Sequence, residues 1–347
     1  MIDSIDEFHS LKKDYNISFE ELVALDLSLS GINCELNFDR VRFELEVNNM
    51  HILPFSIEKN NFSSYNIKDN KLFFKETFLF NINNLQEDDC KILYTRKNDK
   101  VLCFNPNNRS SCEGCCFCYQ PKSSDKQSIS LGIVENTLEI WMQRNNLKNL
   151  SHLEQVAVVT GCFKTEQVTI DYLVKLREIL NSLGFKEEIL FLGIITDIKN
   201  IELLSEIKPL QLCFAIECFE NRNSFLLVRK KLELEKIITL METSLRCGIR
   251  TTFSYIVGLD SFKSFKKNII LLKNYINNFP IISIFQTDNE RLKYRHEEAF
   301  NIEYYLECRK YIEAIFNETN LLPNSWNNYR SLWRTCYHKN NENILLK

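Results

Sequence analysis

From residue 100 onward, short apolar segments alternate with longer amphipathic ones, and this alternation constrains the fold more than any other feature of the chain. Six apolar segments have the length of a strand, and each is followed, directly or after a loop, by a segment whose apolar residues recur every three or four positions. Strands that alternate with helices pair in parallel through right-handed crossovers. The predicted strands are Val101–Phe104, Val156–Val159, Ile189–Ile194, Leu210–Ile216, Thr251–Val257 and Ile281–Phe285.

The number of strand-helix units decides between a closed and an open barrel. Six units are too few to close an eight-stranded barrel, so we predict an α/β fold built as a partial (β/α)6 TIM-like barrel. In such folds the active site lies at the carboxyl ends of the strands. The polar residues and glycines that end the predicted strands are therefore the candidates for chemistry: the cysteine-rich loop after residue 104, Thr160, Gly161, Gly193, Glu217, residues 254–258 and Gln286.

The segment before residue 99 has the pattern of antiparallel strands. Val41–Val47 alternates apolar and polar residues, as a half-buried strand does, and follows a helical segment at 20–29. Further strands are predicted at His51–Ile57, Leu72–Phe80 and Lys91–Tyr94. We therefore predict three domains: a mostly antiparallel β module of unknown role at 1–98, the partial barrel at 99–318, and a tail rich in aromatic residues and arginine at 319–347.

Composition restricts the class of protein and its compartment. The 347 residues carry a net charge of −3, which does not indicate a nucleic-acid surface. No segment reads as a signal peptide or is apolar for long enough to cross a bilayer, so we expect no membrane contact and a cytoplasmic protein. Thiols stay reduced in the cytosol, and the 13 cysteines are therefore expected as buried thiols or metal ligands and not as disulfides.

Four cysteines lie close together, at positions 112, 115, 116 and 118, in the loop after the first predicted barrel strand. A structural zinc site usually takes its ligands as two separated pairs, and the chain has no second pair at a suitable spacing. The side chains of the adjacent Cys115 and Cys116 normally diverge, so both are not expected on one ion. Three thiolates, from Cys112, Cys115 and Cys118, fit an iron-sulfur cluster that leaves one iron open. Cys116 remains the alternative to Cys115.

The sequence Cys115-Cys116-Phe117-Cys118-Tyr119 resembles the cluster-binding loop of radical S-adenosylmethionine enzymes. In that family the loop follows the first strand of a six-fold strand-helix repeat and usually reads CxxxCxxC, with an aromatic residue before the last cysteine. This chain has a shorter first gap and reads CxxCxxC. The resemblance covers roughly residues 101–316. It implies a [4Fe-4S] cluster held by Cys112, Cys115 and Cys118, with S-adenosylmethionine as the second cofactor.

The same resemblance implies cofactor contacts at the ends of several strands, at Tyr119, Thr160, Gly161, Glu217, Ser254 and Ile256. The pair at 160 and 161 matches the turn that receives the amino group of S-adenosylmethionine, and Glu217 matches a polar position that meets its ribose or amino-acid part. The turn at 254–259 is similar to the one that packs on adenine, which the backbone of Tyr119 approaches. Each position also has a structural interpretation, Glu217 as a surface carboxylate and Gly161 as an ordinary turn glycine.

The activity that the resemblance implies is reductive cleavage of S-adenosylmethionine to a 5'-deoxyadenosyl radical, which abstracts hydrogen from a substrate C–H bond. A flavodoxin or ferredoxin is the expected electron donor, and Arg229 and Gln286 are further candidates for binding the cofactor carboxylate and the substrate. A small metabolite is the first candidate for the substrate, and a peptide held by the N-terminal module is the second. The alternative from another class is a non-catalytic metal-binding or interaction protein whose thiols hold structural zinc or a cluster.

Overall fold

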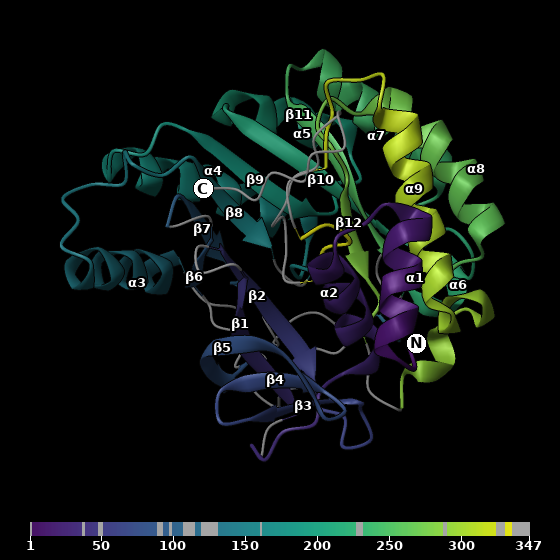
Figure 1. Ribbon diagram of the computed structural model, residues 1–347. Helices are drawn as coiled ribbons and strands as arrows, with labels where there is room; N and C mark the ends of the chain where they lie inside the picture. Colours follow the sequence, from purple (N-terminus) through teal and green to yellow (C-terminus); the bar gives the residue numbers. More distant parts are fainter. Residues whose placement is uncertain are drawn as a thin grey trace.

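The computed structural model describes residues 2–36, 39–47, 51–88, 93–96, 99–106, 115–118, 131–159, 162–226, 232–286, 290–323 and 330–334. Within these ranges the chain forms two sheets (Figure 1). One sheet has seven strands in the order β12-β11-β10-β9-β8-β7-β6, and the other has five in the order β2-β1-β5-β4-β3. The larger sheet and its helices form the α/β body of the molecule, and the smaller sheet belongs to the N-terminal module.

The larger sheet follows the order of the chain from one edge to the other. Its strands are β6 (Leu93–Arg96), β7 (Val101–Phe104), β8 (Gln155–Val159), β9 (Glu188–Gly193), β10 (Leu210–Glu217), β11 (Arg250–Val257) and β12 (Ile281–Ile284). Neighbours from β7 to β12 are parallel, and β6 is antiparallel to β7. Crossovers of one hand between successive parallel strands place the helices on one face. The predicted partial (β/α)6 barrel is confirmed.

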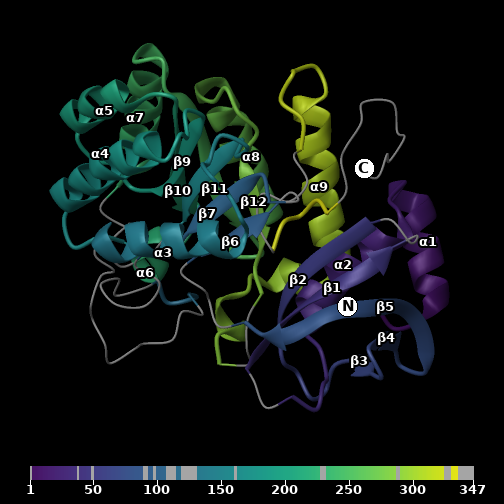
Figure 2. The same ribbon diagram turned by 90° about the vertical axis from the view of Figure 1, so that its left-hand side faces the viewer.

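Some helices of the body begin after a residue whose side chain accepts from a free N–H group of the first turn. The body helices are α3 (Leu131–Arg144), α4 (Glu166–Ser182), α5 (Ile198–Leu204), α6 (Arg222–Phe225), α7 (Leu234–Arg246), α8 (Phe262–Leu272) and α9 (Ile302–Phe316). The side chains of Thr165, Ser261 and Asn301 accept hydrogen bonds from the first turns of α4, α8 and α9. Figure 2 shows α4, α5 and α7 on the same side of the sheet, where they cover its outer face.

The N-terminal module packs two helices, α1 (Ile5–Tyr15) and α2 (Phe19–Ser30), on its antiparallel sheet. The strands are β1 (Arg40–Val47), β2 (His51–Glu58), β3 (Tyr65–Lys68), β4 (Lys71–Phe74) and β5 (Thr77–Glu87). The alternation predicted for β1 is confirmed, because Phe43 is buried and stacks on Phe55 of β2 with ring centroids 5.6 Å apart. Phe8 of α1 contacts Phe74 of β4 at 5.4 Å, which joins the helices to the sheet.

Two strand predictions for this part of the chain are corrected, one in its extent and the other in its place in the fold. The segment Leu72–Phe80 is not one strand but parts of β4 and β5, which pair antiparallel around a turn where Lys75 has φ 53°. That turn contains no glycine or proline, so the sequence carries no strong turn signal. Residues 93 and 94 of the strand predicted at Lys91–Tyr94 belong to β6, but β6 pairs with β7 of the larger sheet and not with the N-terminal module. A short apolar segment does not specify which sheet edge it joins. The domain division at residue 98 stays a prediction.

The C-terminal segment 330–334 lies along the last strand of the large sheet. The backbone N–H of Ile284 donates to the carbonyl of Arg330 at 2.7 Å, and that of Leu332 donates to Ile282 at 3.1 Å. Both views place α1 and α2 beside α9, so the two ends of the described chain meet on one side of the body (Figures 1 and 2). None of the described helices is long and apolar enough to span a membrane.

Candidate active site

One face of the large sheet carries small side chains at several strand positions, among them Cys103, Ala157 and Cys213. Strand register places Cys103 beside Ala157 and Ala157 beside Leu190, in a small cluster separate from the main core. Ala215 lies beside Ser254 in the same way. The Ser254 hydroxyl is buried and has no hydrogen-bond partner within the described part of the chain. A buried hydroxyl without a partner is costly, and a polar ligand on this face would satisfy it.

The described part of the cysteine loop, residues 115–118, is a tight turn packed on the carboxyl ends of three strands. The N–H of Cys118 donates to the carbonyl of Cys115 at 2.9 Å. Phe117 is buried and meets Phe225 and Phe285 edge-on, with ring centroids 6.4 and 6.2 Å apart. Leu259, Cys218 and Ile256 complete this apolar cluster, against which Cys115 packs. Phe117 therefore anchors the loop beside the ends of β10, β11 and β12.

Cys116 has contacts of its own, which bind it to α6. Its backbone N–H donates to the carbonyl of Phe225 at 2.9 Å, and its thiol donates to the carbonyl of Ser224 at 3.3 Å. A polar hollow of about 480 Å³ adjoins α6 and includes Ser224 and Arg222 in its lining. Cys116 therefore contributes to holding the loop in place. Cys115 and Cys118 as cluster ligands stay a prediction, and Cys112 lies outside the described residues.

Glu217, at the end of β10, has a backbone conformation that is unusual for glutamate. Its φ is 67°, in the left-handed region, and the pairing of β10 with β11 shifts register between Ala215 and Glu217. The N–H of Cys218 donates to the carbonyl of Ile216 at 2.9 Å, which closes a three-residue turn centred on Glu217. Turns of this kind with a positive φ are rare and strained. Such strain persists only where surrounding contacts impose it, as they do at many functional sites.

Two charged groups, the half-buried Arg222 and the buried Asp260, hold this turn from opposite sides. The guanidinium of Arg222 donates to the carbonyls of Ile216 and Cys218 at 2.6 and 2.7 Å. The carboxylate of Asp260, after β11, accepts from the backbone N–H groups of Phe219 and Glu220 at 2.7 and 2.8 Å. Hydrogen bonds to charged groups are about twice as strong as neutral ones. The loop after β10 is thereby tied to the end of β11.

Burial changes the acidity of two groups next to this turn. It raises the pKa of Asp260 to about 6, although the hydrogen bonds from Phe219, Tyr255 and Glu220 act in the opposite direction. Burial also raises the pKa of the Cys218 thiol, and the carboxylate of Asp260 adds to that effect. Cys218 is therefore a protonated, neutral thiol near pH 7, and it is not suited to act as a nucleophile.

Gly258 provides the sharp departure of the chain from β11. Its φ is 114°, a conformation that side chains other than hydrogen rarely allow. A Cβ at this position would lie 2.8 Å from the hydroxyl oxygen of Tyr305 and 3.0 Å from the Cβ of Phe285. Glycine is therefore required both by the backbone and by its neighbours, and it allows β11 to approach α9 closely.

The predicted site residues fall into three groups. The structure brings Cys115 and Ile256 into one apolar cluster and places Ser254 and Glu217 on adjacent strands, where Ser254 pairs with Ala215. Gln286 is buried at the boundary with the N-terminal module, where its side-chain oxygen accepts from Arg40 at 3.3 Å. Five predicted positions lie outside the described residues: Cys112, Tyr119, Thr160, Gly161 and Arg229. Among the residues that are described, no group of three or more His, Cys, Asp and Glu side chains could hold a metal ion.

Asp260, Arg222 and Cys218 were not predicted as site residues. Asp260 follows Gly258 and Leu259 directly after a strand, so the rule that selected Glu217 would also have found it. Arg222 has no comparable signal, because its contacts with the carbonyls around Glu217 depend on the course of the loop between them.

No protein-family model and no curated protein matches the chain. Among solved structures it is similar to Streptococcus suis SuiB bound to S-adenosylmethionine, with 14% identity, a TM-score of 0.47, and coverage of 64% of this chain and 48% of that chain. It is similar to coproporphyrinogen III oxidase HemN from Escherichia coli, a radical SAM enzyme, with 13% identity, a TM-score of 0.46, and coverage of 61% and 53%. It is also similar to the hydrogenase maturase HydG from Carboxydothermus hydrogenoformans, with 15% identity, a TM-score of 0.43, and coverage of 62% and 51%. The chain spans about half the length of these proteins. Its function is therefore inferred from its own residues.

Proposed function

We propose that this chain is a radical S-adenosylmethionine enzyme in which Cys112, Cys115 and Cys118 hold a [4Fe-4S] cluster. The observation that carries the proposal is the position of the cysteine turn. Phe117 buries its ring against the carboxyl ends of parallel strands, which is where barrel enzymes bind their substrates. A metal held by Cys115 and Cys118 would therefore lie at the mouth of the partial barrel.

The donor groups at this end of the sheet fit both cofactors. Cysteine thiolates are the ligands of iron-sulfur clusters, and three of them leave one iron free to bind another molecule. The hydroxyl of Ser254 is buried without a partner in the described chain, as expected for a group that meets a polar ligand. Glu217 is held in a strained turn on the neighbouring strand. Ser254, Ile256 and Glu217, together with Tyr119, Thr160 and Gly161, are the proposed contacts to S-adenosylmethionine.

When bound, the cluster and S-adenosylmethionine supply one-electron cleavage of a carbon–sulfur bond and removal of a hydrogen atom from a substrate C–H bond. The residues of this chain orient the reactants and exclude water. Phe117, in the cysteine turn, is buried in one apolar cluster with Phe285 and Leu259. These side chains would exclude water from this side of the site. We propose a small metabolite as the substrate, or a peptide as the second candidate, and a flavodoxin or ferredoxin as the electron donor.

Replacement of single cysteines, each by serine, tests the proposal. After anaerobic reconstitution, the wild-type chain is expected to bind roughly four irons, and the Cys112→Ser, Cys115→Ser and Cys118→Ser variants are expected to lose them. Cys116→Ser is the matched control. A serine hydroxyl can make the same bond to the carbonyl of Ser224, so this variant should keep its iron. Iron and sulfide analysis and the brown absorbance of the cluster measure the outcome.

A second measurement separates an enzyme from a metal-binding protein. Incubation with S-adenosylmethionine and dithionite should yield 5'-deoxyadenosine with the wild type, and not with Cys118→Ala. Equal amounts from the two proteins would exclude the mechanism. A colourless protein with one tightly held zinc ion would favour the non-catalytic alternative.

A further inference from the structure

We infer that Asp260 is a positioning residue for Glu217: its carboxylate holds the loop after β10 so that Glu217 keeps its left-handed conformation at the edge of the candidate site. The inference rests on the proposed function, in which Glu217 contacts S-adenosylmethionine. A buried carboxylate just after the neighbouring strand thus accounts for the strained conformation of Glu217.

Asp260 is fully buried and is itself held firmly. Its carboxylate accepts from the hydroxyl of Tyr255 at 2.8 Å, in addition to the two backbone N–H groups of the loop after β10. Its carbonyl accepts from the hydroxyl of Tyr304 on α9 at 2.7 Å. Phe219 donates its backbone N–H to the Asp260 carboxylate, and its ring stacks on that of Tyr255 with centroids 4.8 Å apart. The loop is therefore fixed relative to β11 both by charge-assisted hydrogen bonds and by ring packing.

The arrangement imposes the positive φ of Glu217 because both sides of the residue are held. Arg222 binds the carbonyls of Ile216 and Cys218, and Asp260 binds the N–H groups of the next two residues. If the bonds from Asp260 are lost, the segment after Glu217 can rotate, and glutamate returns to the more favourable negative φ. A glycine or asparagine would adopt this turn at little cost. The presence of glutamate instead indicates that its carboxylate is needed there.

A double-mutant cycle on S-adenosylmethionine binding tests the coupling. The dissociation constant is measured by equilibrium dialysis with reconstituted protein and no reductant, for the wild type, Asp260→Asn, Glu217→Gln and the double variant. Each single change is expected to weaken binding about tenfold, and the double variant should bind no more weakly than Glu217→Gln. Independent effects that multiply in the double variant, or an unchanged affinity of folded Asp260→Asn, would overturn the inference.

Two further variants serve as controls. Asp197, between β9 and α5, caps α5 by accepting from the N–H of Lys199, and in the described part of the chain its side chain has no hydrogen bond to the loop after β10. Asp197→Asn should leave the affinity unchanged. Tyr255→Phe removes one of the three side-chain bonds of Asp260 and should cause a smaller loss than Asp260→Asn. If Asp260→Asn does not fold, the affinity of Tyr255→Phe for S-adenosylmethionine tests the role of Asp260 instead.

A measurement without cofactor separates this inference from the proposed function. At a residue with positive φ, glycine is more stable than alanine, so Glu217→Gly should unfold at higher urea than Glu217→Ala. In the Asp260→Asn background the difference should vanish or reverse, since the loop no longer imposes the left-handed turn. A difference that persists would refute the role of Asp260, whether or not the chain binds S-adenosylmethionine. If the chain does not bind S-adenosylmethionine but the stability difference between Glu217→Gly and Glu217→Ala disappears in the Asp260→Asn background, only the proposed function is refuted.

Discussion

At the scale of single residues, the sharp turn at Gly258 is a position where the backbone and the neighbouring side chains both oppose any residue larger than glycine. Its φ of 114° is open only to glycine at low cost, and an added Cβ would meet the hydroxyl of Tyr305 at 2.8 Å. The hydroxyl of Tyr305 is buried and has no hydrogen-bond partner in the described chain. Backbone strain and a steric contact therefore act at the same site, and they can be separated by mutation.

We expect Gly258→Ala to lower the free energy of unfolding by about 1–3 kcal/mol, the usual cost of a residue held in a sparsely populated conformation. Tyr305→Phe removes the hydroxyl and is the matched control. Tyr305→Phe alone should leave the free energy of unfolding nearly unchanged. Combined with Gly258→Ala, it should restore only the part of the lost stability that comes from the steric contact. Urea unfolding of the three variants measures this. An unchanged Gly258→Ala variant would contradict the expected strain.

At the scale of elements, one buried carboxylate connects α2 to the strand β3 and to the start of the chain. Asp26 accepts from the N–H of Ile2 at 3.1 Å and from the hydroxyl of Tyr65 at 2.9 Å. Burial raises the pKa of Asp26 to about 6, although these hydrogen bonds act in the opposite direction. The folded protein therefore binds a proton here more readily than the unfolded chain, whose Asp pKa is about 3.9.

The sign of the resulting pH dependence follows from linkage. Because the pKa is higher in the folded state, the contribution of Asp26 to stability is fully present below about pH 4 and is lost as the pH rises through about 6. Asp26→Asn removes this dependence and keeps both contacts, since the Tyr65 hydroxyl can accept as well as donate. The stability of the variant relative to wild type should therefore rise between pH 4 and 6, by up to about 3 kcal/mol, and stay level above. Urea unfolding across this range measures it, and a constant difference would contradict the assignment.

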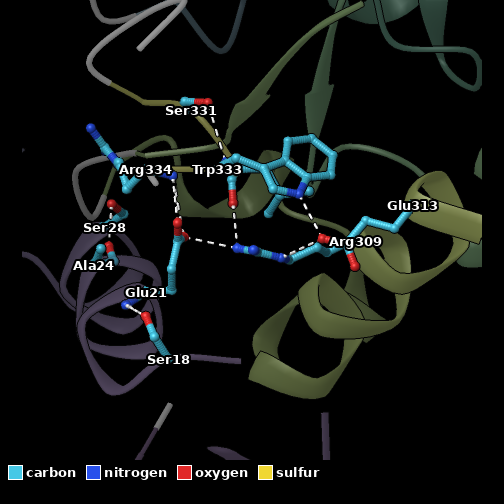
Figure 3. A network of polar contacts seen from close by, with 10 residues as sticks. Ser18, Glu21, Ala24, Ser28, Arg309, Glu313, Ser331, Trp333 and Arg334 are labelled. Carbon is cyan, nitrogen blue, oxygen red and sulfur yellow. Dashed lines mark hydrogen bonds and ion pairs between the residues drawn. The ribbon is translucent and has the colours of Figure 1, made fainter. Parts of the chain in front are cut away.

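At the scale of the whole molecule, Glu21 joins the first and last parts of the described chain (Figure 3). The carboxylate of Glu21, on α2, accepts from the guanidinium of Arg309 on α9 at 2.8 Å and from the backbone N–H of Arg334 at 2.9 Å. Arg309 also binds Glu313, which accepts from the indole N–H of Trp333 at 2.8 Å. This buried network fixes the N-terminal module and the C-terminal segment to the same helix of the barrel.

Glu21→Gln is expected to destabilise the protein by about 3 kcal/mol, because the change leaves Arg309 with less compensation for its buried charge. Hydrogen exchange at the N–H groups of Ile284 and Leu332 should become faster, since these bonds hold the C-terminal segment on β12. Lys100→Ala, which breaks the exposed pair with Glu154, is the control and should cost at most about 1 kcal/mol. Equal effects of the two changes would show that the network does not connect the ends of the chain.

Periodicity and spacing in the sequence determined the architecture of the barrel. Side-chain alternation and helical spacing are local properties, so six parallel strands in chain order could be predicted from residues 101–285. The same locality identified the cysteine loop and the polar residues that end the strands. It failed where a short strand has a possible partner on either side, as for β6, which pairs with the following strand β7 although it was expected in the N-terminal module.

Only the tertiary structure decided how the candidate site is held. The positive φ of Glu217 depends on Arg222 and Asp260, which come from the loop after β10 and from the end of β11. The anchoring of the cysteine turn likewise depends on Phe117 meeting Phe285, far along the chain. The number and order of the strands follow from local residue patterns. The conformation of the residues at their ends follows from contacts between segments that the chain brings together only on folding.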